Sequence, residues 1–230
     1  MDLSFTAEEL AFRAEMRNFF RTKIPDSIRA KVAEGEGMTK DDLVTAQRIM
    51  HDHGLATVNW PVEWGGKDWS PVQVYLYQDE MQQANAPTPI AFNVSMVGPV
   101  IAQFGSQEIK QRFLPKTASA EIFWCQGFSE PGSGSDLASL RTRAERKGDK
   151  YIVNGQKIWT TLGHYGDWIF CLVRTDPSAK AQEGISFLLI DMATPGITVR
   201  PIYLIDGGRE VNEVFFDNVE VPAENLVGQE

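Results

Sequence analysis

The spacing of apolar residues changes once along this chain, near position 121, and that change constrains the fold more than any other feature. Before it, apolar residues recur every three to four positions, as on an amphipathic helix; after it come short apolar runs separated by turn dipeptides. Strands that follow one another with no helix between them favour an antiparallel barrel or sandwich. The sequence therefore predicts an α+β chain, with an all-α helical domain at 1–120 and a β-domain at 121–230.

Helix boundaries are marked by capping residues and prolines. Thr6 and Glu9 form a capping box, and Pro25 is expected to end the helix that they begin. Ser70 is an N-cap followed by Pro71, which is tolerated at the first helical position. Helices are expected at 6–25, 39–53, 70–85, 92–104 and 106–114.

The second half is rich in strand signals. Turns are expected at the dipeptides Gly148-Asp149, Asn154-Gly155, Asp176-Pro177 and Pro195-Gly196. Strands are expected at 122–126, 140–146, 151–153, 157–160, 168–174, 185–191, 197–201 and 213–216.

Charge and composition exclude several classes of protein. With 31 acidic and 22 basic residues the net charge is −9, so no positive field is available for nucleic acid. No run approaches the roughly 20 apolar residues of a membrane span, and the N-terminus does not resemble a secretory signal. We therefore expect a cytoplasmic protein in which Cys125 and Cys171 are buried, reduced thiols.

The segment from Gln126 to Asp136, QGFSEPGSGSD, carries the clearest functional signal. A loop of glycine and serine exposes backbone N–H groups and hydroxyls, which suits a phosphate or the polar edge of a planar cofactor. A flexible surface turn explains the same composition equally well. A dinucleotide fingerprint fails because its third glycine position holds Leu137. Glu130 and Asp136 are interpreted as braces of the loop.

Two further segments contain aromatic residues beside turns. In NGQKIWTTLG, Trp159 offers a face for stacking and Thr160 or Thr161 a nearby hydroxyl, although a tryptophan in a strand is more often core. The segment WPVEWGG at 60–66 could line a pocket, but a tight packing corner is the favoured interpretation. The three histidines, His51, His53 and His164, lack the spacing of a metal site.

Together, the order of these segments resembles the acyl-CoA dehydrogenase family. The family pattern is a T/S-E-P-G-x-G-S-D loop, then N-G-x-K-x-W-I-T, a T-P-G turn and F-x-x-V-x-V-P. It is matched in order by residues 129–136, 154–161, 194–196 and 216–222, with agreement in the helical part at 61–66 and 104–115.

The resemblance implies a FAD enzyme that oxidises an acyl-CoA thioester to the α,β-enoyl-CoA, as in fatty-acid β-oxidation. Such enzymes have a helical domain, a middle β-domain and a C-terminal four-helix domain, of which the last is absent from residues 1–230. Because the family's catalytic glutamate lies in that domain, no catalytic base is named here, and Glu80, Glu130 and Glu213 are not assigned that role. The chain is expected to be incomplete and inactive alone.

The resemblance also assigns site residues. Ser135 is expected beside the acyl-CoA, the Thr161 hydroxyl near the hydride-accepting nitrogen and Trp159 against the ring. Ser129 and Thr160 depart from the usual threonine and isoleucine. The expected FAD contacts are Gln126, Phe128, Ser129, Gly134, Ser135, Trp159, Thr160 and Thr161.

Partners and alternatives follow from the same resemblance. An electron-transfer flavoprotein is the expected electron acceptor, and a homo- or heterotetramer the expected assembly. The stretch at 207–222 resembles bacterial branches that act on bulky acyl groups, including pimeloyl-CoA and steroid-side-chain dehydrogenases. Two alternatives stay open: a flavin oxidase or monooxygenase of the same fold, and a non-catalytic partner subunit.

Overall fold

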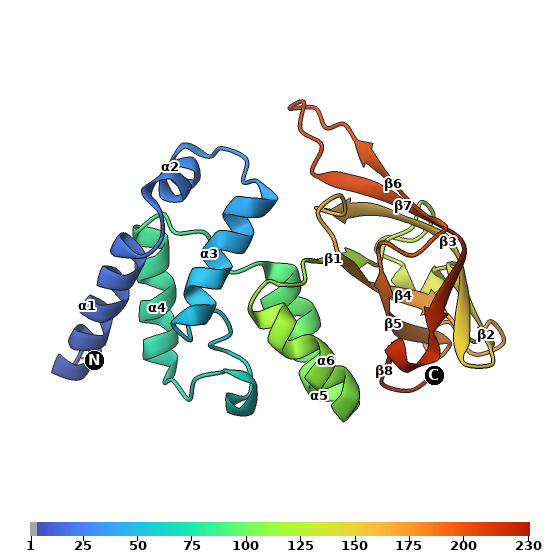
Figure 1. Cartoon of the computed structure of the whole chain (residues 1–230), viewed down its shortest axis with the longest axis horizontal. Helices are drawn as coiled ribbons and strands as arrows, with labels where there is room; N and C mark the ends of the chain where they lie inside the picture. The colour runs from blue at the N-terminus through green and yellow to red at the C-terminus, as the bar shows by residue number, and fades with distance from the viewer. Residues whose placement is uncertain (1–3) are drawn as a thin grey trace. The chain divides into compact units, whose positions relative to one another are not determined.

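The helices begin where the capping residues predict. The computed structural model describes residues 4–230 and opens with α1 (Ala7–Thr22), whose first turn is closed by the capping box of Thr6 and Glu9 (Figure 1). Equivalent boxes at Thr39 and Ser70 begin α3 (Lys40–Asp52) and α4 (Pro71–Gln83). The expected helices at 6–25, 39–53 and 70–85 are confirmed.

Two helix boundaries differ from the sequence prediction because proline can start a helix or lie in its last turn. Pro25 is the N-cap of a further helix, α2 (Asp26–Glu34), which ends at the left-handed Gly35. Pro115 lies inside α6 (Gln107–Ala118), where its missing N–H falls close to the helix end. The expected helix at 92–104 is a π-helical segment, η2 (Phe92–Val97), followed by α5 (Gly98–Phe104).

The described chain packs as two compact units. One contains the chain up to Ser95 together with Ala118–Glu121; the other contains Met96–Thr117 and Ile122–Glu230, so that α5 and most of α6 group with the strands. In the first unit, α1 packs on α4 around buried Met16, Phe20 and Tyr77. The domain boundary at 120 stays a prediction from the sequence.

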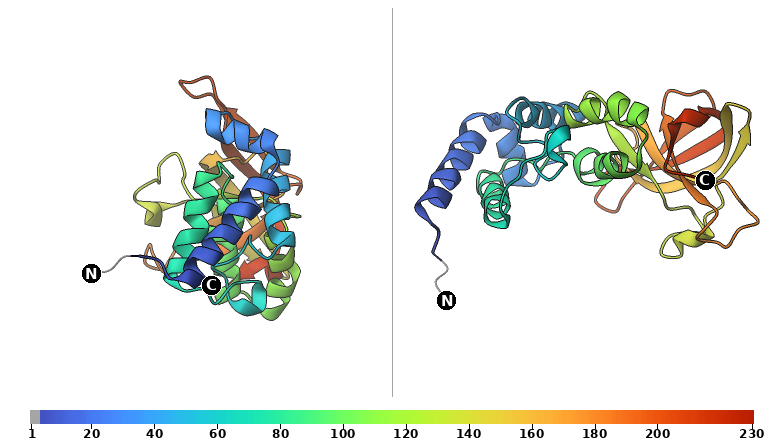
Figure 2. Two further views of the ribbon diagram at one scale, coloured as in Figure 1. Left: turned by 90° about the vertical axis from the view of Figure 1, so that its left-hand side faces the viewer. Right: turned by 90° about the horizontal axis from the view of Figure 1, so that it is seen from below.

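Eight strands form one curved sheet in the second unit, together with the 3-10 turns η3 (Leu137–Ser139) and η4 (Ala223–Asn225) (Figure 2). The order is β6-β7-β3-β2-β4-β5-β8, with β1 beside β4. The strands are β1 (Trp124–Gly127), β2 (Arg143–Lys147), β3 (Lys150–Thr161), β4 (Trp168–Arg174), β5 (Ile185–Asp191), β6 (Ile197–Ile202), β7 (Val211–Pro222) and β8 (Leu226–Val227). The predicted α+β order, helices first and a mainly antiparallel sheet second, is confirmed.

The expected turn at Asn154-Gly155 is wrong. The predicted strands 151–153 and 157–160 are a single strand, β3, which pairs along its length with the equally long β7. Gly155 instead marks a register shift where β3 passes close to Thr142: a Cβ at Gly155 would lie 2.6 Å from Thr142 Oγ1. The glycine therefore allows close approach within the sheet rather than a reversal.

Strand β4 holds both ends of the glycine and serine loop. Along one edge it pairs in parallel with β1, ending at Gly127↔Cys171, and with β2 at Arg143↔Arg174. The chain between them, 128–142, thus leaves the sheet and returns to the same edge three residues further along β4. The topology alone makes this segment a closed loop on the sheet.

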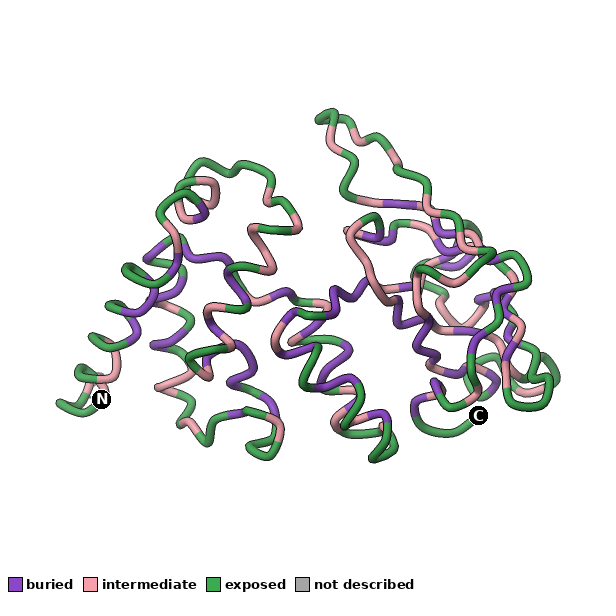
Figure 3. The backbone as a smooth tube through the Cα atoms, in the orientation of Figure 1, coloured by how far each residue is buried: buried purple, intermediate pink, exposed green. Residues whose placement is uncertain are grey.

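The interior of this sheet is apolar and contains both thiols. Cys125 and Cys171 are fully buried and free, and burial raises the pKa of each, that of Cys171 to about 11. The expectation of buried, reduced thiols is confirmed. Figure 3 shows the buried stretches running along the central strands, whereas the loops and much of the connection between β6 and β7 are exposed.

Candidate functional site

The glycine and serine loop lies directly against strand β3. The amide of Ile158 donates to the carbonyl of Ser129 at 2.9 Å, and Lys157 Nζ donates to the carbonyl of Phe128 at 3.1 Å. The two segments singled out in the sequence, 126–136 and 154–163, are therefore neighbours in the second unit.

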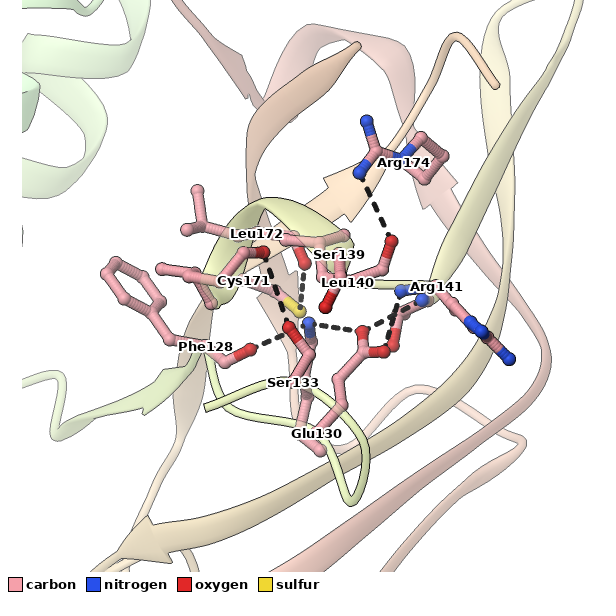
Figure 4. A network of polar contacts seen from close by, with 12 residues as sticks. Phe128, Glu130, Ser133, Ser139, Leu140, Arg141, Cys171, Leu172 and Arg174 are labelled. Carbon is pink, nitrogen blue, oxygen red and sulfur yellow. Dashed lines mark hydrogen bonds and ion pairs between the residues drawn. The ribbon is translucent and has the colours of Figure 1, made fainter. Parts of the chain in front are cut away.

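Glu130 braces the loop, as predicted. Its carboxylate accepts hydrogen bonds from the Arg141 amide (2.6 Å), the Thr142 amide (2.8 Å) and Lys157 Nζ (2.8 Å). Burial alone would raise the pKa of Glu130, but the hydrogen bonds from Lys157 and Thr142 and the lysine charge outweigh it, so its pKa is lowered. Figure 4 shows the carboxylate turned toward the backbone of Arg141.

Hydrogen bonds within the loop define its shape. Glu130 and Ser133 exchange backbone hydrogen bonds of 2.8 and 3.0 Å, which closes a tight turn over Pro131 and Gly132. The Ser133 hydroxyl donates to the Asp136 carbonyl at 2.8 Å and is buried, so it is used inside the loop. Asp136 thus braces the loop through its carbonyl.

All residues from Pro131 to Asp136 except Ser133 are exposed, among them Gly134 and Ser135. A Cβ built on Gly132 or Gly134 would meet nothing within 4 Å, so the space beside the turn is open. A cavity of about 290 Å³ lies between the turn and β3, with Gly132, Ser133 and Gln156 in its wall. The loop therefore combines a fixed backbone with free space beside it.

Trp159 stands out from the strand. It is 56% exposed, so the alternative of an ordinary core tryptophan is wrong. Its φ of 59° lies in the left-handed region, which is unfavourable for a bulky residue, and it falls at a register shift between Lys157 and Thr160. The bulge presents the indole to the surface at the cost of backbone strain, an arrangement common at binding sites.

Thr160 and Thr161 differ in burial. Thr161 is half-buried, whereas Thr160 is 1% exposed, the only buried residue among the eight predicted cofactor contacts. Thr160 pairs across the strands with Asn212, which donates to its carbonyl at 3.1 Å. Within residues 4–230, the Thr160 hydroxyl and Asn212 Oδ1 are buried without a hydrogen-bond partner.

The first residues of the loop are held by neighbouring side chains. Phe128 packs edge-on against Phe170 and Phe187, with ring centroids 5.8 and 6.4 Å apart. Gln126 Nε2 lies 3.8 Å from Met96 Sδ. Both residues are half-buried, so each keeps an accessible face.

Two supporting residues were missed from the sequence. Lys157 is fully buried, and its sequence neighbours, which include Gly155 and Gln156, gave no sign of this. Arg174 donates to the carbonyls of Ala138 (2.6 Å) and Ala181 (2.6 Å), and so ties the end of the loop to the 176–184 turn. No sequence motif predicted this role of Arg174.

The remaining candidate segment is structural. Trp60 donates through Nε1 to the carbonyl of Val94 at 2.7 Å, and a Cβ on Gly66 would collide with the Trp60 carbonyl at 1.6 Å. The interpretation of WPVEWGG as a packing corner is therefore confirmed.

The carboxylates considered as bases are all engaged. Glu80 is held by Arg13 (2.6 Å) and Arg17 (2.8 Å), whose hydrogen bonds and charges lower its pKa despite burial. Glu213 accepts from Gln156 Nε2 at 2.9 Å. None is poised to abstract a proton.

Two other kinds of feature are absent from residues 4–230. Among these residues, no trio of His, Cys, Asp or Glu side chains is arranged for a metal ion. No helix in the same range is long and apolar enough to cross a bilayer.

Comparison with known families decides the identity of the fold. The family model described as acyl-CoA dehydrogenase, N-terminal domain, matches residues 6–121, and that of the acyl-CoA dehydrogenase middle domain matches 125–219. The chain belongs to the acyl-CoA dehydrogenase family. The resemblance first drawn from the loop and strand motifs is thereby confirmed.

Three relatives within this family illustrate the similarity. The acyl-CoA dehydrogenase IpdE1 of Mycobacterium tuberculosis is 36% identical over 94% of this chain. The ChsE4-ChsE5 complex from the same organism contains a chain 34% identical, with a TM-score of 0.85 over the whole of this chain. A steroid ACAD, Tcur3481-Tcur3483, is 34% identical with a TM-score of 0.86, again over the whole chain. This chain spans 58% of IpdE1, 58% of the ChsE chain and 59% of the Tcur chain.

Proposed function

We propose that residues 1–230 are the N-terminal and middle part of a FAD-dependent acyl-CoA dehydrogenase. The observation that carries this proposal is the contact between the braced loop and β3, through Ile158 and Ser129, beside the strained and exposed Trp159. An open indole face, exposed loop backbone and free space beside the loop glycines fit a flat ring with polar edges.

The proposed FAD contacts are those expected from the sequence, except that Thr160, whose side chain is buried, would not touch the cofactor through that side chain. Trp159 would pack against the ring, the Thr161 hydroxyl would donate near its hydride-accepting nitrogen, and the exposed Ser135 would lie beside the acyl-CoA. Thr160 would support its two neighbours from the interior. The other contacts are Gln126, Phe128, Ser129 and Gly134.

The chemistry divides between the cofactor and the protein. FAD, when bound, supplies the oxidant that accepts the hydride from the β-carbon of the thioester. The hydrogen bonds of the loop would hold its backbone donors in place, which favours a reaction that needs precise orientation. The proton acceptor for the α-carbon is proposed to lie outside residues 4–230, because Glu80, Glu130 and Glu213 are all engaged in other bonds.

A bulky, steroid-like acyl group is the proposed substrate class. This finer assignment is supported by the similarity to the Tcur3481-Tcur3483 steroid ACAD, which extends over the whole chain. It rests on relatives rather than on an acyl pocket, and it is tested by comparing steroid-side-chain and straight-chain acyl-CoA substrates in one assay.

The test uses the full natural protein with any co-purifying partner. We expect it to be yellow, and its flavin absorbance to bleach anaerobically when a suitable acyl-CoA is added. A colourless protein that takes up no FAD would contradict the proposal. Peroxide formation without an added acceptor would instead support the flavin oxidase, whereas electron transfer to an electron-transfer flavoprotein supports the dehydrogenase.

A second candidate is a subunit of a heteromeric dehydrogenase. It is favoured because two similar solved structures are named as pairs of proteins, ChsE4-ChsE5 and Tcur3481-Tcur3483. Native mass spectrometry of the protein purified from its host separates the possibilities: a single chain type indicates a homo-oligomer, and two chain types indicate a heteromer.

A further inference from the structure

We infer that Lys157 and Glu130 form a positioning pair that sets the geometry of the loop 128–142 beside Trp159. The inference rests on the proposed function, because it concerns the same cofactor site. Neither residue would touch the cofactor; both would act through the loop backbone.

The pair connects both ends of the loop to one strand. Lys157 Nζ, fully buried on β3, reaches the carbonyl of Phe128 at the start of the loop and Glu130 Oε1 two residues on. The Glu130 carboxylate in turn accepts from the amides of Arg141 and Thr142 at the end of the loop. One ammonium and one carboxylate thus hold Phe128 close to Arg141 and Thr142, which lie 13 and 14 positions later in the chain.

The clamp lies next to the strained part of the strand. Ile158, which follows Lys157, donates to Ser129, and Trp159 comes immediately after it. Movement of the lysine would therefore shift the loop and the indole relative to each other. On the other side, the contact between Gly155 and Thr142 leaves no room for the loop end to slide toward β3.

Because both charges are buried, the cost of removing them from water offsets much of the stability gained from their attraction. A contribution to stability therefore does not by itself explain the pair. Lys157 is 0% and the Glu130 side chain 8% exposed, so both charges are largely removed from water. Buried pairs of this kind are often no more stabilising than apolar residues of the same volume. The directional bonds to Phe128, Arg141 and Thr142 are what an apolar pair could not provide, and they are all loop contacts.

The chain contains a matched control in its first unit. Glu80 is likewise buried and is bonded by Arg13 and Arg17, but these bonds join α1 to α4 within the first unit. Glu80→Gln should therefore weaken folding without altering the site.

The experiment measures hydrogen exchange of the loop and FAD affinity in the full natural protein. We expect Lys157→Met to speed amide exchange across 128–142 at least about tenfold, and to weaken FAD binding by about tenfold or more. Glu80→Gln should lower the thermal midpoint while loop exchange and FAD affinity stay within about twofold of wild type.

A double variant separates an effect on the position of the loop from an effect on folding. Glu130→Gln/Lys157→Met removes both charges and leaves no uncompensated ion, so its thermal midpoint should recover while loop exchange stays fast and FAD binding stays weak. If Lys157→Met does not fold, the double variant alone decides. The inference would be overturned if the amides of 128–142 exchanged no faster in Lys157→Met, or in the double variant, than they do in the control Glu80→Gln.

Failure of the proposed function gives a different result. A wild-type protein that binds no FAD would refute the cofactor site, while loop exchange, measured without FAD, would still test the clamp. Faster loop exchange with unchanged FAD affinity would overturn the positioning role.

Discussion

The backbone amide of Ile158 donates to the carbonyl of Ser129 at 2.9 Å, which joins the glycine and serine loop to the strand that carries Trp159. These residues lie 29 positions apart, yet the bond holds together the two segments that the sequence marks for a cofactor.

Replacement of Trp159 should separate binding from stability. Trp159→Ala and Trp159→Gly both remove the exposed indole, so both should weaken FAD binding. Only glycine accepts the φ of 59° without strain, so Trp159→Gly should be more stable than Trp159→Ala by about 1 kcal/mol. Urea denaturation measures the difference; equal stability would show that the backbone relaxes in both variants.

Gly155 should not tolerate a side chain. Its φ is 152°, and a Cβ would lie 2.7 Å from Thr142 Cα, so we expect Gly155→Ala to reduce the free energy of unfolding by about 2 kcal/mol. Gly132→Ala is the control, because nothing lies within 4 Å of its Cβ position, and its effect should stay within about 0.5 kcal/mol. Similar losses for both variants would argue against close packing at Gly155.

The buried hydroxyl of Thr160 should be dispensable. Since no residue among 4–230 bonds to it, Thr160→Val should leave the free energy of unfolding unchanged or raise it by about 1 kcal/mol. Thermal unfolding of the two proteins provides the measurement. A loss of more than about 1 kcal/mol would indicate that a bound water or ligand satisfies the hydroxyl.

Acid should loosen the loop through Glu130. Its pKa is depressed below the ordinary 4.5 in the folded protein, because its hydrogen bonds and the lysine charge outweigh burial. A depressed pKa contributes stability above pH 4.5 that is lost as the pH falls through the folded-state value. We expect the free energy of unfolding to fall less steeply below pH 4.5 in Glu130→Gln than in wild type. Identical slopes would contradict the pKa direction.

Local signals predicted much of the helical part. Capping boxes at Thr6, Thr39 and Ser70 act within one turn, so the sequence alone located those helices. Pro25 follows the end of the first helix as predicted, but the helix α2 that begins after it was missed, because a proline can also start a helix and only packing decides whether one forms. The continuity of β3 was missed because it depends on β7, some sixty residues later.

The sequence predicted the two segments of the candidate site but not the residues that hold them in place. Composition identified the loop and Trp159, whereas the role of Lys157 depends on carbonyl and carboxylate groups brought close only by the sheet. The accessible face of Trp159 was one of two interpretations of the sequence, but the bulge that exposes it was not predicted, because strand alternation gives no sign of a bulge.

The most direct test of the cofactor site is hydrogen exchange of the full natural protein with and without FAD. We predict that FAD slows exchange in both 126–136 and 158–161, the two segments joined by Ile158 and Ser129. FAD binding that leaves both segments unchanged, and protects only other parts of the protein, would contradict the site.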